Sequence, residues 1–157
     1  MGECMSVEEI FDRIEGLLSE ISEKIGSVDI IIVSTSEGHP ISYYSPEKID
    51  ENVVSDLSAL LGGIGEGLKV ILDELKIAHH NEEVILLETR EHIFVLVPLE
   101  KASIAIKVRK PALLGTVRAV IKSYIPRINE LLAKLEEAQM KMMREELVKE
   151  VTPISIQ

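Results

Sequence analysis

Two adjacent histidines followed by two glutamates are the residues of this chain whose types best suit metal chemistry. His79 and His80 are next to each other, and Glu82 and Glu83 follow. Imidazole nitrogens and carboxylate oxygens are ligands that bind zinc. Neighbouring residues in regular structure do not face one ion, however, and no third ligand follows at a useful spacing. We interpret these four residues as a solvated loop and expect no metal site.

A run of spaced glycines, Gly63-Ile-Gly-Glu-Gly, has the composition of a phosphate-binding loop. Glycines that cradle a dinucleotide lie between a strand and the start of a helix. Here they lie in the middle of a helical pattern. No nucleophile has a base beside it, since Cys4 lies near the terminus and Ser34 in a predicted strand. We therefore expect neither a cofactor nor an enzyme activity.

The same glycines interrupt an amphipathic helix, which we predict over residues 50–76. Each glycine inside a helix costs roughly 1 kcal/mol relative to alanine, so some interaction must compensate. Apolar residues recur along this helix at alternating spacings of four and three, which is typical of one apolar face. They are Leu57, Leu61, Ile64, Leu68, Ile71 and Leu75.

Small residues form two rows on this helix. Ala59, Gly63 and Gly67 recur every four residues, and Ser58 with Gly62 forms a parallel row. Because such rows lack bulky side chains, another backbone can approach them closely. We predict that the apolar stripe faces the core of the domain. The small-residue face would then pack against a second copy of this helix or against a partner.

The composition indicates one domain with an aliphatic core. The chain has 157 residues, of which 46% are hydrophobic and only 3% aromatic. The net charge of −10 argues against nucleic-acid binding, which needs clustered basic residues. Residues 1–91 carry −14 and residues 92–157 carry +4. The acidic half suits solubility, and it could also steer a basic partner.

The single cysteine and the short apolar runs predict a cytoplasmic protein. One cysteine cannot form an intrachain disulfide, which favours a reducing compartment. No apolar run is long enough to span a bilayer. Abundant Glu, Lys and Ile with only two Gln and three Asn are typical of a thermophile.

The hydrophobic periodicity predicts elements in the order α-β-β-α-β-β-β-α. The last three strands follow one another too closely for parallel crossovers, which indicates an antiparallel meander. Pro40 cannot donate a hydrogen bond to a neighbouring strand, so its strand should lie at an edge. We predict an α+β fold, a five-stranded antiparallel sheet covered by helices. The predicted strands are residues 28–35, 39–44, 83–89, 92–97 and 102–108.

The last helix begins after Pro111 and is expected to kink or break at Pro126. We therefore divide the chain into a domain at 1–125 and a helical extension with a tail at 126–157. The extension is charged and amphipathic. It could dock on its own sheet, form an intermolecular coil or bind a groove in a partner.

The element order together with several short patterns resembles the Roadblock/dynein-light-chain family. This family includes a bacterial gliding-motility GTPase regulator and subunits of the lysosomal Ragulator scaffold. The resemblance covers about residues 6–125. The patterns that carry it are residues 28–33, 38–41, 60–66, 93–99 and 113–118.

The resemblance implies a Roadblock/profilin-like sandwich that forms a homodimer. The central helices would pack side by side and the third strands would pair, giving one ten-stranded sheet. It also implies a non-enzymatic scaffold or regulator of a small Ras-like GTPase, with no cofactor. The long final helix departs from the minimal family domain. The expected dimer or partner interface consists of Ser58, Ala59, Gly62, Gly63, Glu66, Gly67, Val84 and Leu86.

An alternative function is that of a small-molecule sensor with a pocket on the sheet face. Such a pocket needs a few polar groups that orient the ligand. The predicted strands are almost entirely aliphatic and offer few such groups.

Overall fold

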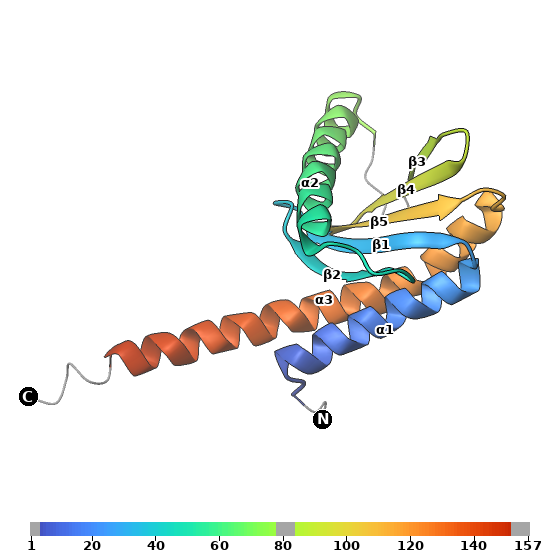
Figure 1. Cartoon of the computed structure of the whole chain (residues 1–157). Coiled ribbons are helices and arrows are strands. Elements are labelled where there is room, and N and C mark those ends of the chain that lie inside the picture. The colour runs from blue at the N-terminus through green and yellow to red at the C-terminus, as the bar shows by residue number, and fades with distance from the viewer. Residues whose placement is uncertain (1–3, 78–83, 152–157) are drawn as a thin grey trace, which may run out of the picture.

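The computed structural model describes residues 4–77 and 84–151. It contains three helices and five strands in the predicted order (Figure 1). The α+β fold class is confirmed. The elements are α1 (Val7–Ile25), β1 (Val28–Thr35), β2 (Pro40–Tyr44), α2 (Glu51–Glu74), β3 (Ile85–Glu88), β4 (His92–Pro98), β5 (Ala102–Arg109) and α3 (Leu114–Val151).

The five strands form one antiparallel sheet in the order β2-β1-β5-β4-β3. The predicted meander is β3-β4-β5, and β5 then pairs with β1 in the centre of the sheet. Pro40 begins β2, which is an edge strand as predicted. β3 forms the other edge.

Helices cover both faces of the sheet (Figure 1). α1 and α3 lie side by side against one face, where the main core forms. Alternation along β1 and β5 sends Ile31 and Ile106 into this core. α2 lies against the other face, where Ile30 and Ile32 pack against Val54 in a smaller cluster.

α1 begins and ends at residues that cap helices. The Ser6 hydroxyl accepts a hydrogen bond from the backbone N–H of Glu9 at 3.2 Å and so caps the first turn. Gly26 ends the helix with a φ of 87°, a left-handed conformation that glycine adopts without strain. This fixed start and end place the buried side of α1 against α3.

α3 continues without a break through Pro126, so the expected break is wrong. Pro126 lies on the exposed side of the helix, whereas Ile125 and Ile128 are buried on the other side. Packing of these neighbours against the core holds the helix together across the missing N–H group. Burial continues as far as Leu135, so the first part of the expected extension docks on its own domain. The division of the chain at residue 125 stays a prediction.

Replacing Ile128 with valine should lower the free energy of unfolding by about 1 kcal/mol, because it removes one buried methylene group. Met142→Ala, beyond the docked part of α3, should change it by less than about 0.5 kcal/mol. Urea unfolding followed by circular dichroism measures both. Equal effects would show that α3 does not join the core beyond Pro126.

Within residues 4–77 and 84–151, no helix has the length and hydrophobicity that crossing a membrane requires.

Candidate interaction surface

The inner face of α2 contains the Ser58–Gly62 row, so the prediction that the apolar stripe faces the core is wrong. The buried residues of α2 are Val54, Ser58, Gly62 and Gly65. Ser58 is fully buried, and its hydroxyl has no hydrogen-bond partner among the described residues. Ser58 and Gly62 therefore face the sheet of their own chain and cannot form the expected partner surface.

The β1–β2 hairpin explains why α2 turns its glycines inward. A Cβ atom on Gly62 would lie 2.7 Å from the Cα atom of Gly38 and 2.8 Å from its nitrogen. Gly38 has a φ of 91°, which favours glycine at this turn. A Cβ atom on Gly65 would lie 3.2 Å from the Oγ atom of Ser103. Close approach of the helix to its own sheet thus compensates for two of the four glycines.

The other expected residues of α2 lie at the surface. Ala59, Gly63, Glu66 and Gly67 are all exposed. A Cβ atom on Gly63 or Gly67 would have no atom within 4 Å, so no contact inside the described chain requires these two glycines.

The apolar stripe of α2 is exposed to solvent instead of facing the core. Leu60 is 65% exposed, Ile64 52% and Ile71 53%. Leu57, Leu61 and Leu68 are half-buried and lie between the exposed residues and the buried face. We call the exposed set the α2 stripe. It consists of Val53, Leu60, Ile64, Ile71 and Leu75.

The free edge of β3 adds a second apolar feature. β3 pairs with β4 alone in the described sheet, so its outer edge presents unpaired backbone groups. Leu86 and Leu87 are exposed, whereas Val84, just before β3, is half-buried against the main core. Of the two β3-region residues expected at an interface, only Leu86 is thus exposed, at 39%.

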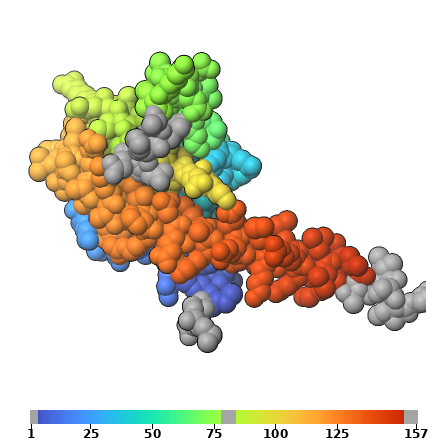
Figure 2. Space-filling model, turned by 180° about the vertical axis from the view of Figure 1, so that it is seen from behind, coloured from blue at the N-terminus to red at the C-terminus, as the bar shows by residue number. Residues whose placement is uncertain are grey.

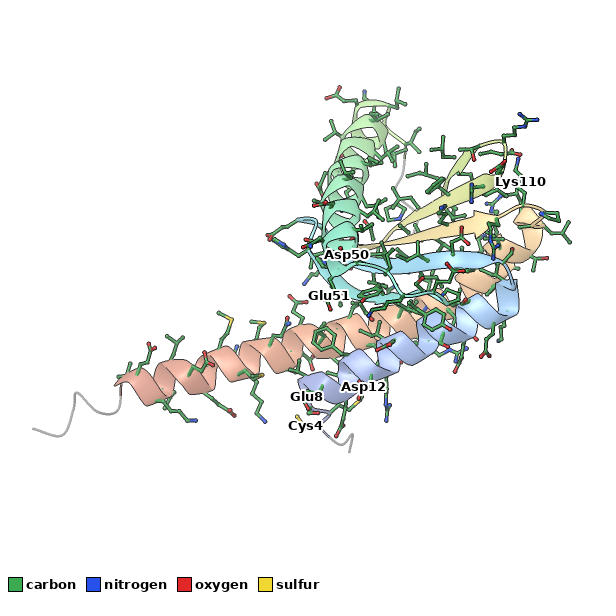
Figure 3. All side chains as sticks on the ribbon, in the orientation of Figure 1. Cys4, Glu8, Asp12, Asp50, Glu51 and Lys110 are labelled. Atoms are coloured by element: carbon green, nitrogen blue, oxygen red, sulfur yellow. The ribbon has the colours of Figure 1, made fainter. Side chains whose placement is uncertain are left out.

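The sheet beyond α2 is partly uncovered on the α2 side. Leu87 lies opposite Phe94 in the β3–β4 register, and Phe94 lies opposite Lys107, which in turn lies opposite Ile30. Residues opposite each other share a face, and Ile30 packs against α2. Leu87 and the exposed Phe94 therefore lie on the same face as α2. Figure 3 shows side chains of α2 and of this end of the sheet on one side of the sheet.

A charged cluster joins three strands on this face. The Asp29 carboxylate lies 2.9 Å from Nε of Arg109, 3.6 Å from Nζ of Lys107 and 3.5 Å from Nε2 of His92. Asp29 thus offsets the positive charge of two β5 side chains. From the sequence, His92 reads as an exposed polar residue at the start of a strand. Its acidic neighbour is missed because Asp29 comes 63 residues earlier and only the register brings the two together.

A hollow of about 710 Å³ lies on the other side of the sheet, between α3 and the turns of the sheet. Its apolar lining includes Phe11, Ile41 and Leu99. At its rim Nζ of Lys101 donates to both carboxylate oxygens of Glu136 at 2.9 Å. The hydrogen bond and the charge of Glu136 raise the pKa of Lys101 above its usual value.

The described residues contain no group of three or more His, Cys, Asp or Glu side chains that could hold a metal ion. His79, His80, Glu82 and Glu83 lie outside the described residues. Cys4 is exposed and forms no disulfide.

Neither a protein-family profile nor a curated protein sequence matches the chain. Solved structures do match it. Myxococcus xanthus MglB shares 15% identity with a TM-score of 0.71, covering 86% of this chain and 95% of that one. The gliding protein MglB of Thermus thermophilus shares 17% identity with a TM-score of 0.65, covering 82% and 91%. A Roadblock/LC7 domain of Streptomyces avermitilis shares 12% identity with a TM-score of 0.61, covering 73% and 96%. With α2 on one face of the sheet and α1 and α3 on the other, the chain has the Roadblock/LC7 fold.

Proposed function

We propose that this protein is a non-enzymatic homodimeric scaffold that regulates a small Ras-like GTPase. The observation that carries the proposal is the combination of the exposed α2 stripe with the open edge of β3. Large apolar surfaces of this kind typically mark sites of protein association.

A second copy of the chain suits this surface. A two-fold axis beside β3 would pair the two β3 edges antiparallel, because such an axis reverses the strand direction. The backbone groups of both edges would then be satisfied in one ten-stranded sheet. The same axis would bring the two α2 stripes together. Gly63 and Gly67 flank the stripe and would let the helix backbones approach closely.

The GTPase part of the proposal rests on the fold and on the family resemblance. The protein shares the fold of gliding protein MglB and of a Roadblock/LC7 domain. The family that its sequence patterns resemble acts on small Ras-like GTPases. Its non-enzymatic character follows from the sequence, in which no nucleophile has a base placed beside it.

Light scattering and affinity capture test the two parts separately. The purified protein should have at least twice the mass of the chain at micromolar concentration, and a monomer would contradict the dimer. The immobilised protein should capture a Ras-like GTPase of its host in one nucleotide state in preference to the other. If the immobilised protein captured none of these GTPases in either nucleotide state, this would contradict the regulatory role.

Gly63→Leu should split the dimer without unfolding either chain. The leucine side chain would separate the paired helices, whereas its Cβ atom would have open space around it within its own chain. Gly16→Leu is the matched control, because Gly16 is also an exposed helical glycine with open space around it. Light scattering should show a lower mass for the first variant alone, with equal helical circular dichroism in both. A Gly63→Leu variant whose mass is unchanged would place Gly63 outside the interface.

A further inference from the structure

The last four turns of α3 form an almost fully exposed helical tail, whose start is held to the domain by the ion pair between Lys101 and Glu136. All of its residues from 136 to 151 are exposed except the half-buried Ala138. It extends about 24 Å past the docked part of α3, at 1.5 Å per residue (Figures 1 and 2). An isolated helix of this length is only marginally stable in water, so a binding partner would add to its stability.

One face of the tail is an apolar ridge. Met140, Met143, Leu147 and Val151 recur at spacings of three and four and are each about half exposed or more. We call these four residues the tail ridge.

The same helix face leads back into the hollow beside the sheet. Asn129, Ala133 and Glu136 precede Met140 at spacings of four, three and four, and all three line the hollow. The face therefore has a depression over its first half and a ridge over its second half. A surface with this form is complementary to a copy of itself that runs in the opposite direction.

We propose that the tail pairs antiparallel with the tail of a second copy, about a two-fold axis near Met140. This register places Leu147 of each helix opposite the small Ala133 of the other, at the hollow. It also places Val151 opposite Asn129 at the same hollow. Apolar residues that repeat every three and four positions are the pattern that joins two helices in a coiled coil.

The charges of the tail complement this register. Glu136 and Glu137 precede Met140, whereas Lys141 and Arg144 follow it. Antiparallel pairing about Met140 brings Glu137 of each helix across from Arg144 of the other. Parallel pairing would leave both hollows empty, because each ridge would lie against the other ridge.

This contact is independent of the dimer proposed above. The α2 stripe lies on one face of the sheet, and α3 lies on the other (Figure 1). Two interfaces of this kind on one chain would join dimers into tetramers or longer assemblies.

Cysteine crosslinking tests the direction of the pairing. In a Cys4→Ser background, Met140→Cys should form a disulfide-linked dimer on oxidation, because the axis brings position 140 against itself. Leu147→Cys is the matched control and should remain unlinked, because it faces Ala133. Linkage at both positions would indicate parallel helices, and linkage at neither would indicate unpaired tails. Either result overturns the proposal.

Mass measurements on point variants test the contact itself and separate it from the α2 interface. Leu147→Glu should weaken tail pairing at least about 30-fold and reduce the assembly to a single dimer. Met142→Glu changes an exposed residue on another side of the tail and should leave the mass unchanged. In an Ile64→Glu background, which is directed at the α2 interface alone, the tail contact should persist as a dimer that Leu147→Glu abolishes.

The expected pair of Glu137 with Arg144 of the other helix gives a further test. Arg144→Glu should weaken the assembly, and adding Glu137→Arg should restore it, since the swapped charges attract again. A mass that is insensitive to Leu147→Glu would overturn the proposal. The proposal is also overturned if Leu147→Glu keeps the mass but loses the capture of a GTPase. The tail ridge would then be a site for a different partner.

Discussion

Replacing Gly62 with alanine should lower the free energy of unfolding by about 2–3 kcal/mol. The added Cβ atom would lie 2.7 Å from the Cα atom of Gly38, and the atoms it meets belong to backbone that no side-chain rotation can move. The helix or the β1–β2 hairpin would have to shift. Such a shift would disturb the packing of Ile30 and Ile32 against α2.

Gly63→Ala is the matched control because it lies one residue further along the same helix. A Cβ atom at this position meets no atom within 4 Å. Alanine is the better helix former, so this change should raise the free energy of unfolding by up to about 1 kcal/mol. Thermal unfolding at one fixed protein concentration compares the two variants, at about 2–4 °C per kcal/mol for a chain of this size. Similar melting temperatures would mean that α2 does not approach the hairpin as closely as described.

In a Leu147→Glu background, which lacks the tail contact proposed above, replacing Ile64 with glutamate should convert the proposed dimer into a monomer at micromolar concentration. Ile64 lies in the middle of the α2 stripe and is 52% exposed in the single chain. Dimer formation would bury a carboxylate there with no partner of opposite charge, which is costly in an apolar contact. Changing a central interface residue of this kind weakens the free energy of association by about 2 kcal/mol or more. The dissociation constant would then rise at least about 30-fold.

Met142→Glu, made in the same background, is the control for this variant. Met142 is also 52% exposed, but it lies on α3, which covers the other face of the sheet. Sedimentation equilibrium should give a monomer for Ile64→Glu and a dimer for Met142→Glu, with the same circular dichroism for both. If both variants dissociate, or neither does, the stripe does not form the dimer contact.

The two pairs of variants separate the functions of neighbouring glycines on one helix. Gly62 and Gly65 let α2 approach its own sheet, so changes there should alter stability. Gly63 and Gly67 have open space around them, so changes there should alter association. Four glycines that look equivalent along the sequence thus divide into an inner pair and an outer pair.

Local patterns in the sequence determined the elements and their order. A helix or strand reveals its type through the periodicity of its own residues, and its ends through caps such as Ser6 and Gly26. Short connections determined that the last three strands form a meander. Pro40 determined that β2 lies at an edge, because a missing donor is a property of the residue itself.

The tertiary structure alone decided which face of α2 is buried. Both the apolar stripe and the small-residue row are regular, and either one could face the sheet. The outcome depends on Gly38, which precedes Gly62 by 24 residues and approaches it only once the hairpin has folded. The cluster around Asp29 and the continuity of α3 through Pro126 were decided in the same way. Each depends on packing between segments far apart in the chain, and periodicity within one segment contains no information about its neighbours.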